Sequence, residues 1–250
     1  MNNRWFKLIR SLQQKKFRKK EGLFLVEGTK SVSDLCASDY KVQAIFYTEK
    51  FQQKHSYLLT ETSCYQELTK PDRLKQAGTL MQNDTVLAVA ETQSFTEGFS
   101  VEANEIVLML DDVRDPGNLG TILRLADWYG IHRIICSPTS ADMYNPKVVI
   151  ASMGSFARVQ VHYLDLEKYL SENQGSVTVC GAFMEGENVH NVSLKLPTIV
   201  VMGNESNGIR QELFPYINQK ISIPQYGSGE SLNVAMATGI ICDNLMRMKN

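Results

Sequence analysis

The stretch ISIPQYGSGESLNVAMATGI, residues 221–240, begins as an apolar run of strand character, breaks at Pro224 and passes through a glycine-rich polar loop. It then enters an apolar helix through Ser231, Leu232 and Asn233. Glycines let a backbone approach a ligand closely, and the start of a helix offers free N–H groups to a polar ligand. The stretch therefore predicts a strand, a ligand-binding loop and a helix within an α/β domain.

Two further loops of the same kind precede it in the chain. DDVRDPGNLGTILRLADWYG follows the apolar run 106–110, and GNESNGI follows the run 198–202. In a parallel sheet the ligand lies beyond the carboxyl ends of the strands, where such loops gather. One such loop is often an ordinary turn with a helix cap, but three in one domain favour a binding site.

Short apolar runs alternate with helical patterns along the whole chain. Strands are predicted at 23–28, 42–48 and 85–91 in the first part, and at 106–110, 133–137, 158–164, 177–183, 198–203 and 220–224 in the second. The second series predicts a mostly parallel sheet with helices on both faces. We expect a small α/β domain at 1–95, a linker at 96–104 and a second domain at 105–250.

Composition and cysteine usage exclude several classes of protein. With 43% hydrophobic and 21% charged residues the 250-residue chain is expected to fold, and no apolar run reaches the roughly 18 residues of a membrane span. The basic N-terminus lacks the apolar stretch of a secretory signal, so we expect a cytoplasmic protein. The five scattered cysteines include no C-x-x-C pair and the four histidines show no ligand spacing, so neither disulfides nor a metal site is predicted.

Positive charge is concentrated in the first part of the chain. Residues 1–95 contain 15 Lys and Arg against 10 Asp and Glu, whereas the rest of the chain contains 11 against 17. Neutralised phosphates release counterions and bases stack on aromatic rings, so the cations around Phe17 in KKFRKK suit a nucleic acid. A solvated helix end is the alternative, because Lys and Arg favour the last turn of any helix. The candidate RNA-binding residues are Lys15, Lys16, Arg18, Lys19 and Lys20.

The familiar nucleotide-binding patterns are absent from the sequence. There is no G-x-x-x-x-G-K-[ST], and GSGESL at 227–232 lacks the third glycine of a dinucleotide fingerprint. The segments NLGTILRLADWYG, VVMGNESNGI and ISIPQYGSGESLNVAMA instead resemble, in this order, the three motifs of the SpoU/TrmH family of RNA ribose 2′-O-methyltransferases. KKFRKKEGLFLVEGTKSV similarly resembles the ribosomal-protein-like substrate-binding domain that many members carry.

This resemblance implies an S-adenosylmethionine-dependent enzyme of the SPOUT superfamily, with a deep trefoil knot in the C-terminal domain and a homodimer formed through that domain. The implied substrate is RNA; ribosomal RNA is preferred over transfer RNA because the extra N-terminal domain recurs among members that act on ribosomal RNA. A base-modifying SPOUT enzyme and a non-catalytic RNA-binding protein are the alternatives. The last helix carries an apolar stripe, Ile240, Ile241, Leu245 and Met248, which suits a core or a subunit interface.

The resemblance also implies roles for single residues. Arg124 matches the arginine that contacts the substrate phosphate and activates the 2′-hydroxyl. Because a guanidinium hardly loses a proton, we expect Arg124 to lower the pKa of the hydroxyl and not to act as its base. A surface salt bridge is the alternative role. Asn118 is expected to cap its helix and orient the site, and Glu205 to orient the arginine or brace its loop. The implied catalytic residues are Arg124, Asn118, Glu205, Ser231 and Asn233. The implied donor-binding residues are Met202, Gly203, Ile223, Pro224, Leu232 and Asn233.

Some positions depart from the commoner family pattern. Leu125 replaces a usual small hydroxyl residue, Gln225 a usual methionine, and Ala235-Met236 a frequent Ser-Val. None of these changes removes an implied catalytic group. They bear on substrate preference more than on activity.

Overall fold

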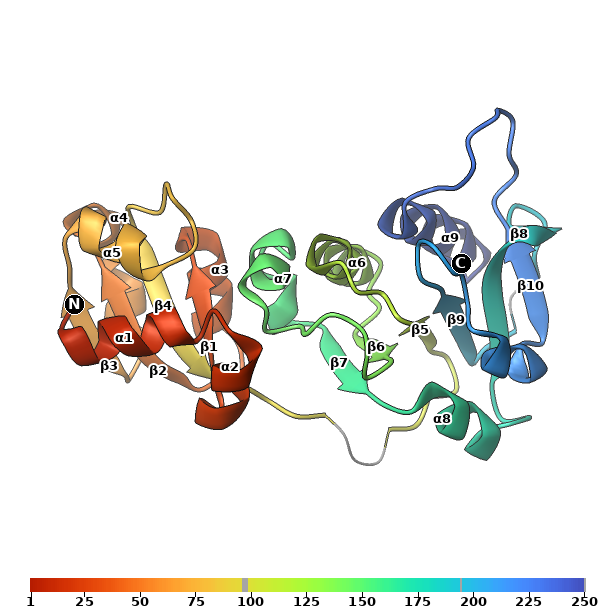
Figure 1. The fold of residues 1–250 in the computed structure, drawn as a ribbon, viewed down its shortest axis with the longest axis horizontal. Helices are drawn as coiled ribbons and strands as arrows, with labels where there is room; N and C mark the ends of the chain where they lie inside the picture. The colour runs from red at the N-terminus through yellow and green to blue at the C-terminus, as the bar shows by residue number, and fades with distance from the viewer. Residues whose placement is uncertain (96–98, 194, 250) are drawn as a thin grey trace. The chain divides into compact units, whose positions relative to one another are not determined.

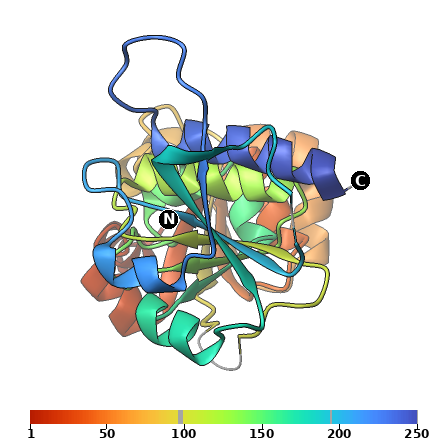
Figure 2. The same ribbon diagram turned by 90° about the vertical axis from the view of Figure 1, so that its right-hand side faces the viewer.

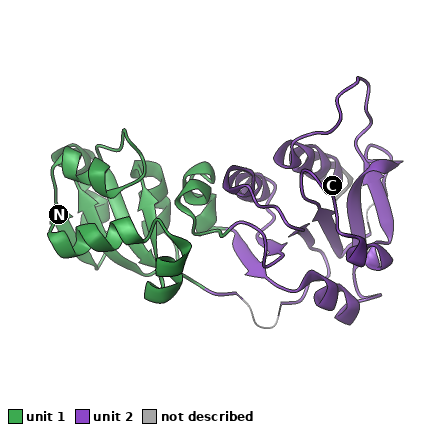
Figure 3. Ribbon diagram, viewed as in Figure 1, with its two compact units in different colours: residues 1–93, 142–158 green, residues 94–141, 159–250 purple. Residues whose placement is uncertain are grey.

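The computed structural model describes all of the chain except residues 96–98, 194 and 250, and it divides into two compact units (Figures 1 and 3). Unit 1 comprises residues 1–93 and 142–158, and unit 2 comprises the remainder. The segment 142–158 is thus flanked in sequence by parts of unit 2 but packs within unit 1. Of the predicted linker, residues 96–98 lie outside the described residues.

Unit 1 is built on a four-stranded sheet in the order β1-β4-β2-β3. The strands are β1 (Leu23–Glu27), β2 (Val42–Tyr47), β3 (Tyr65–Leu68) and β4 (Val86–Glu91). Strand β4 runs antiparallel to β1 and β2, whereas β2 and β3 are parallel. Three of the four strands were predicted; β3 was not, because none of its four residues is fully buried and it leaves no apolar run.

Helices cover both faces of this sheet. Helices α1 (Asn3–Ser11) and α5 (Pro71–Ala77) pack on the face that carries Leu25. Helices α3 (Thr29–Cys36) and α7 (Pro146–Ala151) pack on the other face, where Phe24 contacts Tyr144 with ring centroids 4.6 Å apart. Helices α2 (Lys15–Glu21) and α4 (Glu49–Glu61) complete the unit. Segment 142–158 therefore supplies part of the core of unit 1.

Unit 2 is built on a six-stranded sheet in the order β10-β8-β9-β5-β6-β7, and all neighbouring strands are parallel. The strands are β5 (Ile106–Leu110), β6 (Arg133–Cys136), β7 (Gln160–Tyr163), β8 (Thr178–Asn188), β9 (Thr198–Met202) and β10 (Gln219–Ser222). Strands β5 and β9 are buried along their whole length, which is why they appear as continuous apolar runs. All six strands were predicted, so the expected fold class is confirmed; the trefoil knot within it stays a prediction.

Helices also cover both faces of the second sheet. Helices α6 (Pro116–Trp128) and α9 (Val234–Lys249) pack together on one face, and α8 (Leu166–Glu172) with the 3-10 helix η2 (Gln211–Tyr216) on the other (Figure 2). On α9, Ile241 and Leu245 are each 1% exposed, so the predicted stripe serves the core at these positions. The side chain of Met248 lies outside the described residues. No described helix is long and apolar enough to cross a bilayer.

Candidate active site

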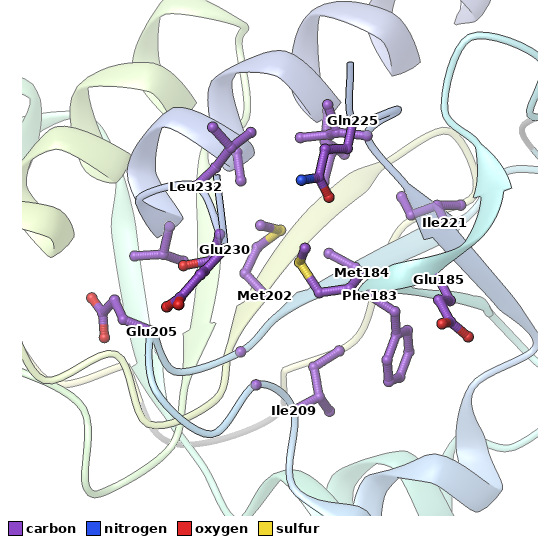
Figure 4. A pocket seen from close by; sticks show the side chains of 18 of the residues that line it. Phe183, Met184, Glu185, Met202, Glu205, Ile209, Ile221, Gln225, Glu230 and Leu232 are labelled. Carbon is purple, nitrogen blue, oxygen red and sulfur yellow. The ribbon is translucent and has the colours of Figure 1, made fainter. Parts of the chain in front are cut away.

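A cavity of about 1050 Å³ opens in unit 2 at the carboxyl ends of β9 and β10. Its walls come from β8, from the loop after β9 and from the loop after β10 (Figure 4). Five of the predicted donor-binding residues line it: Met202, Gly203, Ile223, Pro224 and Leu232. The sixth, Asn233, lies outside this lining. The volume and the mixed apolar and polar walls are typical of a small-molecule site.

The loop after β9 folds back on itself at Gly203. A Cβ atom at this position would lie 2.2 Å from the carbonyl carbon of Gly208 and 2.3 Å from the amide nitrogen of Ile209. Asn204 and Gly208 exchange two backbone hydrogen bonds, of 3.0 and 2.9 Å, which close the loop. An approach this close leaves no room for a side chain, so the loop geometry requires glycine at position 203.

Two consecutive aspartates at the end of β5 anchor this loop. The buried Asp111 accepts hydrogen bonds from the backbone nitrogen and from Nε of Arg210, at 2.8 and 2.7 Å. The carbonyl of Asp112 accepts a hydrogen bond from Nδ2 of Asn204 at 2.8 Å. Burial would raise the pKa of the Asp112 carboxyl, but hydrogen bonding from Arg114 and the charge of Arg210 hold that pKa below its ordinary value. Both ends of the loop are therefore fixed to the sheet.

Three of the predicted catalytic side chains meet beside the cavity. Nδ2 of Asn118 donates to Oε1 of Glu205 at 2.5 Å, and Oδ1 of Asn118 accepts from Nδ2 of Asn233 at 2.9 Å. These residues come from α6, from the loop after β9 and from the loop before α9, so one amide joins all three sequence motifs. Ser231 lines the cavity together with Glu205.

The structure corrects the role expected for Asn118. The N-cap of α6 is Asp115, whose carboxylate accepts a hydrogen bond of 2.8 Å from the backbone nitrogen of Asn118. Asn118 lies inside the first turn of the helix, where its amide is free to bind Glu205 and Asn233. Glu205 accepts a hydrogen bond from this amide, and no contact with Arg124 is found among the described residues, so which of its two expected roles it has stays a prediction.

Asn233 both joins this network and caps α9. Its Oδ1 accepts hydrogen bonds from the backbone nitrogens of Ala235 and Met236, at 2.9 and 3.3 Å. The amide thus uses its oxygen to start the helix and its nitrogen to hold Asn118. A capping role explains the hydrogen bonds that Oδ1 accepts, but not the one that Nδ2 donates to Asn118.

Arg124 lies apart from the other predicted catalytic residues. It is exposed on α6 and lies outside the cavity lining, and its side chain forms no hydrogen bond or ion pair with any residue that the structure describes. Arg124 lies six positions after Asn118, and this separation corresponds to about 9 Å along the helix and about 120° around it. Trp128, four positions further on, shares its side of the helix and is 83% exposed. The surface salt bridge that was the alternative role is not formed among the described residues.

Carboxylates dominate the charge around the cavity. Glu185, Glu205 and Glu230 belong to its lining, whereas Lys220 is the only cation among the described lining residues. Figure 4 shows Glu205 and Glu230 on one side of the cavity and Glu185 on the other. Such a lining attracts a cationic ligand and repels phosphate. No group of three or more His, Cys, Asp or Glu in the described part of the chain could hold a metal ion.

Sequence analysis did not single out the anchors Asp111, Asp112 and Arg210. The signal that could have identified them is the pair of aspartates directly after a buried strand in LDDVRDPG. A carboxylate at the end of a buried strand needs a partner, because burying an unpaired charge is costly. The partner itself lies 99 positions away and leaves no local pattern.

On unit 1, the structure separates Arg18 from the other candidate RNA-binding cations. Lys15, Lys16, Lys19 and Lys20 are exposed, whereas Arg18 is 3% exposed. Its guanidinium donates to the carbonyls of Leu12 and Gln13, at 2.9 and 3.0 Å, and to the carboxylate of Asp142 at 2.7 Å. Arg18 therefore holds α2 against segment 142–158, and its inclusion among the phosphate-binding residues is corrected.

Helix α1 carries cations that sequence analysis did not include. Arg4, Lys7 and Arg10 are all exposed and repeat every third residue. Residues with this spacing lie on one side of a helix. The repeat is readable in RWFKLIR, where it alternates with the apolar residues of the buried side.

Both parts of the chain are similar to known proteins. Residues 105–243 match the model of the SpoU rRNA Methylase family, and residues 3–91 match that of the MRM3-like substrate binding domain. The chain is 30% identical over 243 residues to an uncharacterized tRNA/rRNA methyltransferase of Synechocystis, covering 94% of this chain and 88% of the relative. It is 29% identical over 246 residues to the 23S rRNA guanosine 2′-O-methyltransferase RlmP of Bacillus subtilis, covering 94% and 93%. The crystal structure of the SpoU methyltransferase AviRb from Streptomyces viridochromogenes in complex with AdoMet is similar with a TM-score of 0.89 at 26% identity, covering 99% of each chain.

Proposed function

This chain belongs to the SpoU rRNA methylase family, and we propose that it transfers a methyl group from S-adenosylmethionine to a ribose 2′-hydroxyl of ribosomal RNA. The observation that carries the proposal is the hydrogen-bonded trio of Asn118, Glu205 and Asn233, which joins three motifs beside the cavity. Residues 1–95 would bind the RNA substrate and residues 105–250 would carry the transfer. A cytoplasmic location fits this substrate.

The residues of the cavity fit S-adenosylmethionine. Met202, Ile223 and Leu232 offer apolar walls for an adenine ring, and the close approach at Gly203 brings backbone polar groups to its edge. The carboxylates of the lining favour a positively charged sulfonium. When bound, the sulfonium supplies an activated methyl group. Structures of two related methyltransferases with AdoMet bound support this assignment.

The residues of the chain then have to align the acceptor oxygen and help to remove its proton. Asn118 is held from two sides, by Glu205 and Asn233, so the site is ordered before RNA arrives. Arg124 would hold a phosphate beside the acceptor ribose and lower the pKa of the 2′-hydroxyl by its charge. A guanidinium donates hydrogen bonds but does not take up protons near neutral pH, so Arg124 activates the hydroxyl without serving as its base, and the proton of the hydroxyl passes to water as the O–CH3 bond forms.

Methylation by the purified protein tests the proposal. Unmodified transcripts of ribosomal and transfer RNA are incubated with methyl-labelled donor, digested to nucleosides and analysed by mass spectrometry. The expected product is a 2′-O-methylated nucleoside from the ribosomal transcript. A methylated base would favour a base-modifying enzyme, label in transfer RNA alone would change the substrate, and RNA binding without any label would favour a non-catalytic RNA-binding protein.

We also propose a homodimer formed through the face of unit 2 that carries α6 and α9. Trp128 on α6 is 83% exposed and Met236 on α9 is 63% exposed, and the two helices pack against each other. Large apolar side chains exposed on neighbouring packed helices are typical of association surfaces, whereas single ones are common on any surface. Arg124 shares the side of α6 that carries Trp128, so association through this face would place Arg124 against a second copy, and we propose that it there reaches the cavity of that copy.

Trp128→Glu is expected to convert the dimer to a monomer at micromolar concentration, because it places a charge in an apolar contact. Light scattering measures the mass. Met81→Glu is the matched control, since Met81 is 88% exposed on unit 1 and should not affect association. A parent protein that is itself monomeric at this concentration would refute the proposed dimer.

Mixing two defective variants tests whether the second copy supplies Arg124. One variant carries Arg124→Ala and the other carries Gly203→Ala, which is expected to weaken donor binding, and both are assayed at a donor concentration too low to load the Gly203→Ala site. In a mixed dimer, the site with the intact donor loop can receive Arg124 from the other chain, so methylation should recover on mixing. Failure to recover, in a sample whose mixed dimers are verified by mass, would assign Arg124 to the site of its own chain.

The exposed cations of α1 and α2 are proposed to bind the RNA backbone. Replacing Lys15, Lys16, Lys19 and Lys20 by Gln should weaken RNA binding and reduce the slope of log affinity against log salt by about 0.7–0.9 for each lost contact. Fluorescence anisotropy with a ribosomal RNA transcript at several salt concentrations measures this slope. Affinity for the donor should stay at the parental value.

A matched variant controls for loss of charge alone. Lys41 and Lys50 are exposed on the same unit and pair with Glu91 and Asp84. Replacing these two lysines by Gln should leave the salt slope unchanged, because their charges are already neutralised locally. An unaltered salt slope in the variant that lacks all four lysines would mean that α2 is a solvated helix end and does not contact RNA.

A further inference from the structure

The loop between β10 and α9 presents a tyrosine that no step described so far uses. Tyr226 belongs to the cavity lining and is 92% exposed. The loop projects from unit 2 in both ribbon views (Figures 1 and 2). Ser231 and Asn233, two of the proposed catalytic residues, lie further along the same loop. Tyr226 therefore lies on the segment that an acceptor ribose has to approach.

A glutamine side chain fixes the turn that carries this tyrosine. Nε2 of Gln225 donates to the carbonyl oxygens of Gly227 and Gly229, both at 2.8 Å. These two bonds hold residues 225–229 in a turn, with the ring of Tyr226 in water. A Cβ atom added at Gly227 or Gly229 would meet nothing within 4 Å, so the space around the turn is open. A planar group can approach the ring without displacing protein atoms.

The charge of the cavity lining disfavours an ionic contact with RNA at this place. The lining contains three glutamates and one lysine, and carboxylates repel phosphate. A nucleobase is uncharged, and it stacks on an aromatic ring with little regard to its sequence. At the opening of this cavity, a contact with an RNA base is therefore more favourable than a contact with the RNA phosphate backbone.

Tyr226 is also the lining aromatic with a free face. Phe183 and Phe214 belong to the same lining but pack edge to face, with ring centroids 5.3 Å apart. The ammonium of Lys220 lies over both of these rings, at 5.0 and 5.5 Å from their centroids. The rings of Phe183 and Phe214 are therefore already packed against other side chains, whereas the ring of Tyr226 is open to a ligand.

We propose that Tyr226 stacks on a nucleobase at or beside the methylated nucleotide and thereby positions the acceptor ribose at the cavity. The inference rests on the proposed RNA methyltransferase function. The ring supplies a neutral contact beside the acidic lining, while Arg124 and the exposed cations of α1 and α2 hold the phosphates of the RNA backbone. Tyr226 is thus a positioning residue for RNA, and its side chain, which is 92% exposed, is not expected to hold the donor.

Steady-state kinetics on the transcript that the parent protein methylates test this role. Tyr226→Ala is expected to raise the KM for that transcript about fivefold to a hundredfold, the range of one base–aromatic stack, with the donor Kd unchanged by calorimetry. Tyr226→Phe keeps the ring and should match the parent. Ser228→Ala, in the same loop, controls for disturbance of the turn and should also match the parent.

RNA fragments that span the mapped site, each with one abasic nucleotide at or beside it, identify the stacked base. With the parent protein, removing that base should raise the KM as Tyr226→Ala does, and with Tyr226→Ala it should add nothing. Additive losses, a parental KM for Tyr226→Ala, or a lower mass of this variant in light scattering would each overturn the inference. A parent protein that methylates no RNA would instead overturn the proposed function, so the two failures are distinct.

Discussion

Arg124→Ala is expected to slow methyl transfer about a hundredfold or more in a single turnover with saturating donor and RNA. The guanidinium is exposed and has no ionic partner among the described residues, so it is free to meet an anionic group of the substrate. Removing a preorganised donor from the place where charge develops has a cost on this scale. Donor affinity should survive, because Arg124 lies outside the cavity lining.

Arg124→Lys separates the charge of this residue from its shape. Lysine keeps the positive charge but loses the planar fork, so it should recover little of the rate if two oxygens are gripped together and much of it if a point charge suffices. Arg247→Ala is the matched control, because Arg247 is an exposed cation of α9 that pairs with Asp243. A rate for folded Arg124→Ala within about threefold of the parent would remove Arg124 from the mechanism.

The sheet of unit 2 was predictable because buried parallel strands leave a strong pattern. Strands β5 and β9 are apolar at nearly every position, since helices cover both of their faces. Strand β3 of unit 1 is short and partly exposed, so its four residues look like loop sequence. The difference is one of burial, because periodicity reports burial and not strand formation as such.

The cap of α6 can be read from the sequence. In DPGN both Asp115 and Asn118 are good capping residues. Proline favours the first position of a helix, so Pro116 selects the residue before it as the cap. Because Asp115 caps the helix, the side-chain amide of Asn118 is available to bind Glu205 and Asn233.

The buried state of Arg18 could not be read from the sequence. In KKFRKK it looks like the four exposed lysines around it. Its carboxylate partner, Asp142, lies 124 positions away in a segment that packs within unit 1. Tyr144, from the same segment, contacts Phe24 across a similar separation. Pairings over such distances are set by tertiary packing, and a single sequence carries no local mark of them.

Gly203→Ala is expected to weaken donor binding by about fivefold to a hundredfold. The new Cβ would lie 2.2 Å from the carbonyl carbon of Gly208, and the atoms in its way belong to the backbone. Overpacking of this kind typically costs about 1–3 kcal/mol, and each 1.4 kcal/mol is about tenfold in affinity. The loop cannot shift freely to relieve the contact, because Asp111 and Asp112 hold Arg210 and Asn204 at its two ends. The strain is therefore expected to displace the wall of the cavity that faces the donor.

Calorimetric titration with S-adenosylmethionine measures this effect, and thermal unfolding without donor shows whether the variant is folded. Gly229→Ala is the matched control: Gly229 also lines the cavity, but a Cβ there would meet nothing within 4 Å. This variant should bind the donor as the parent does, because the same chemical change causes no contact. A parental donor Kd for folded Gly203→Ala would show that the close approach of residues 203 and 208 is not needed to form the donor site.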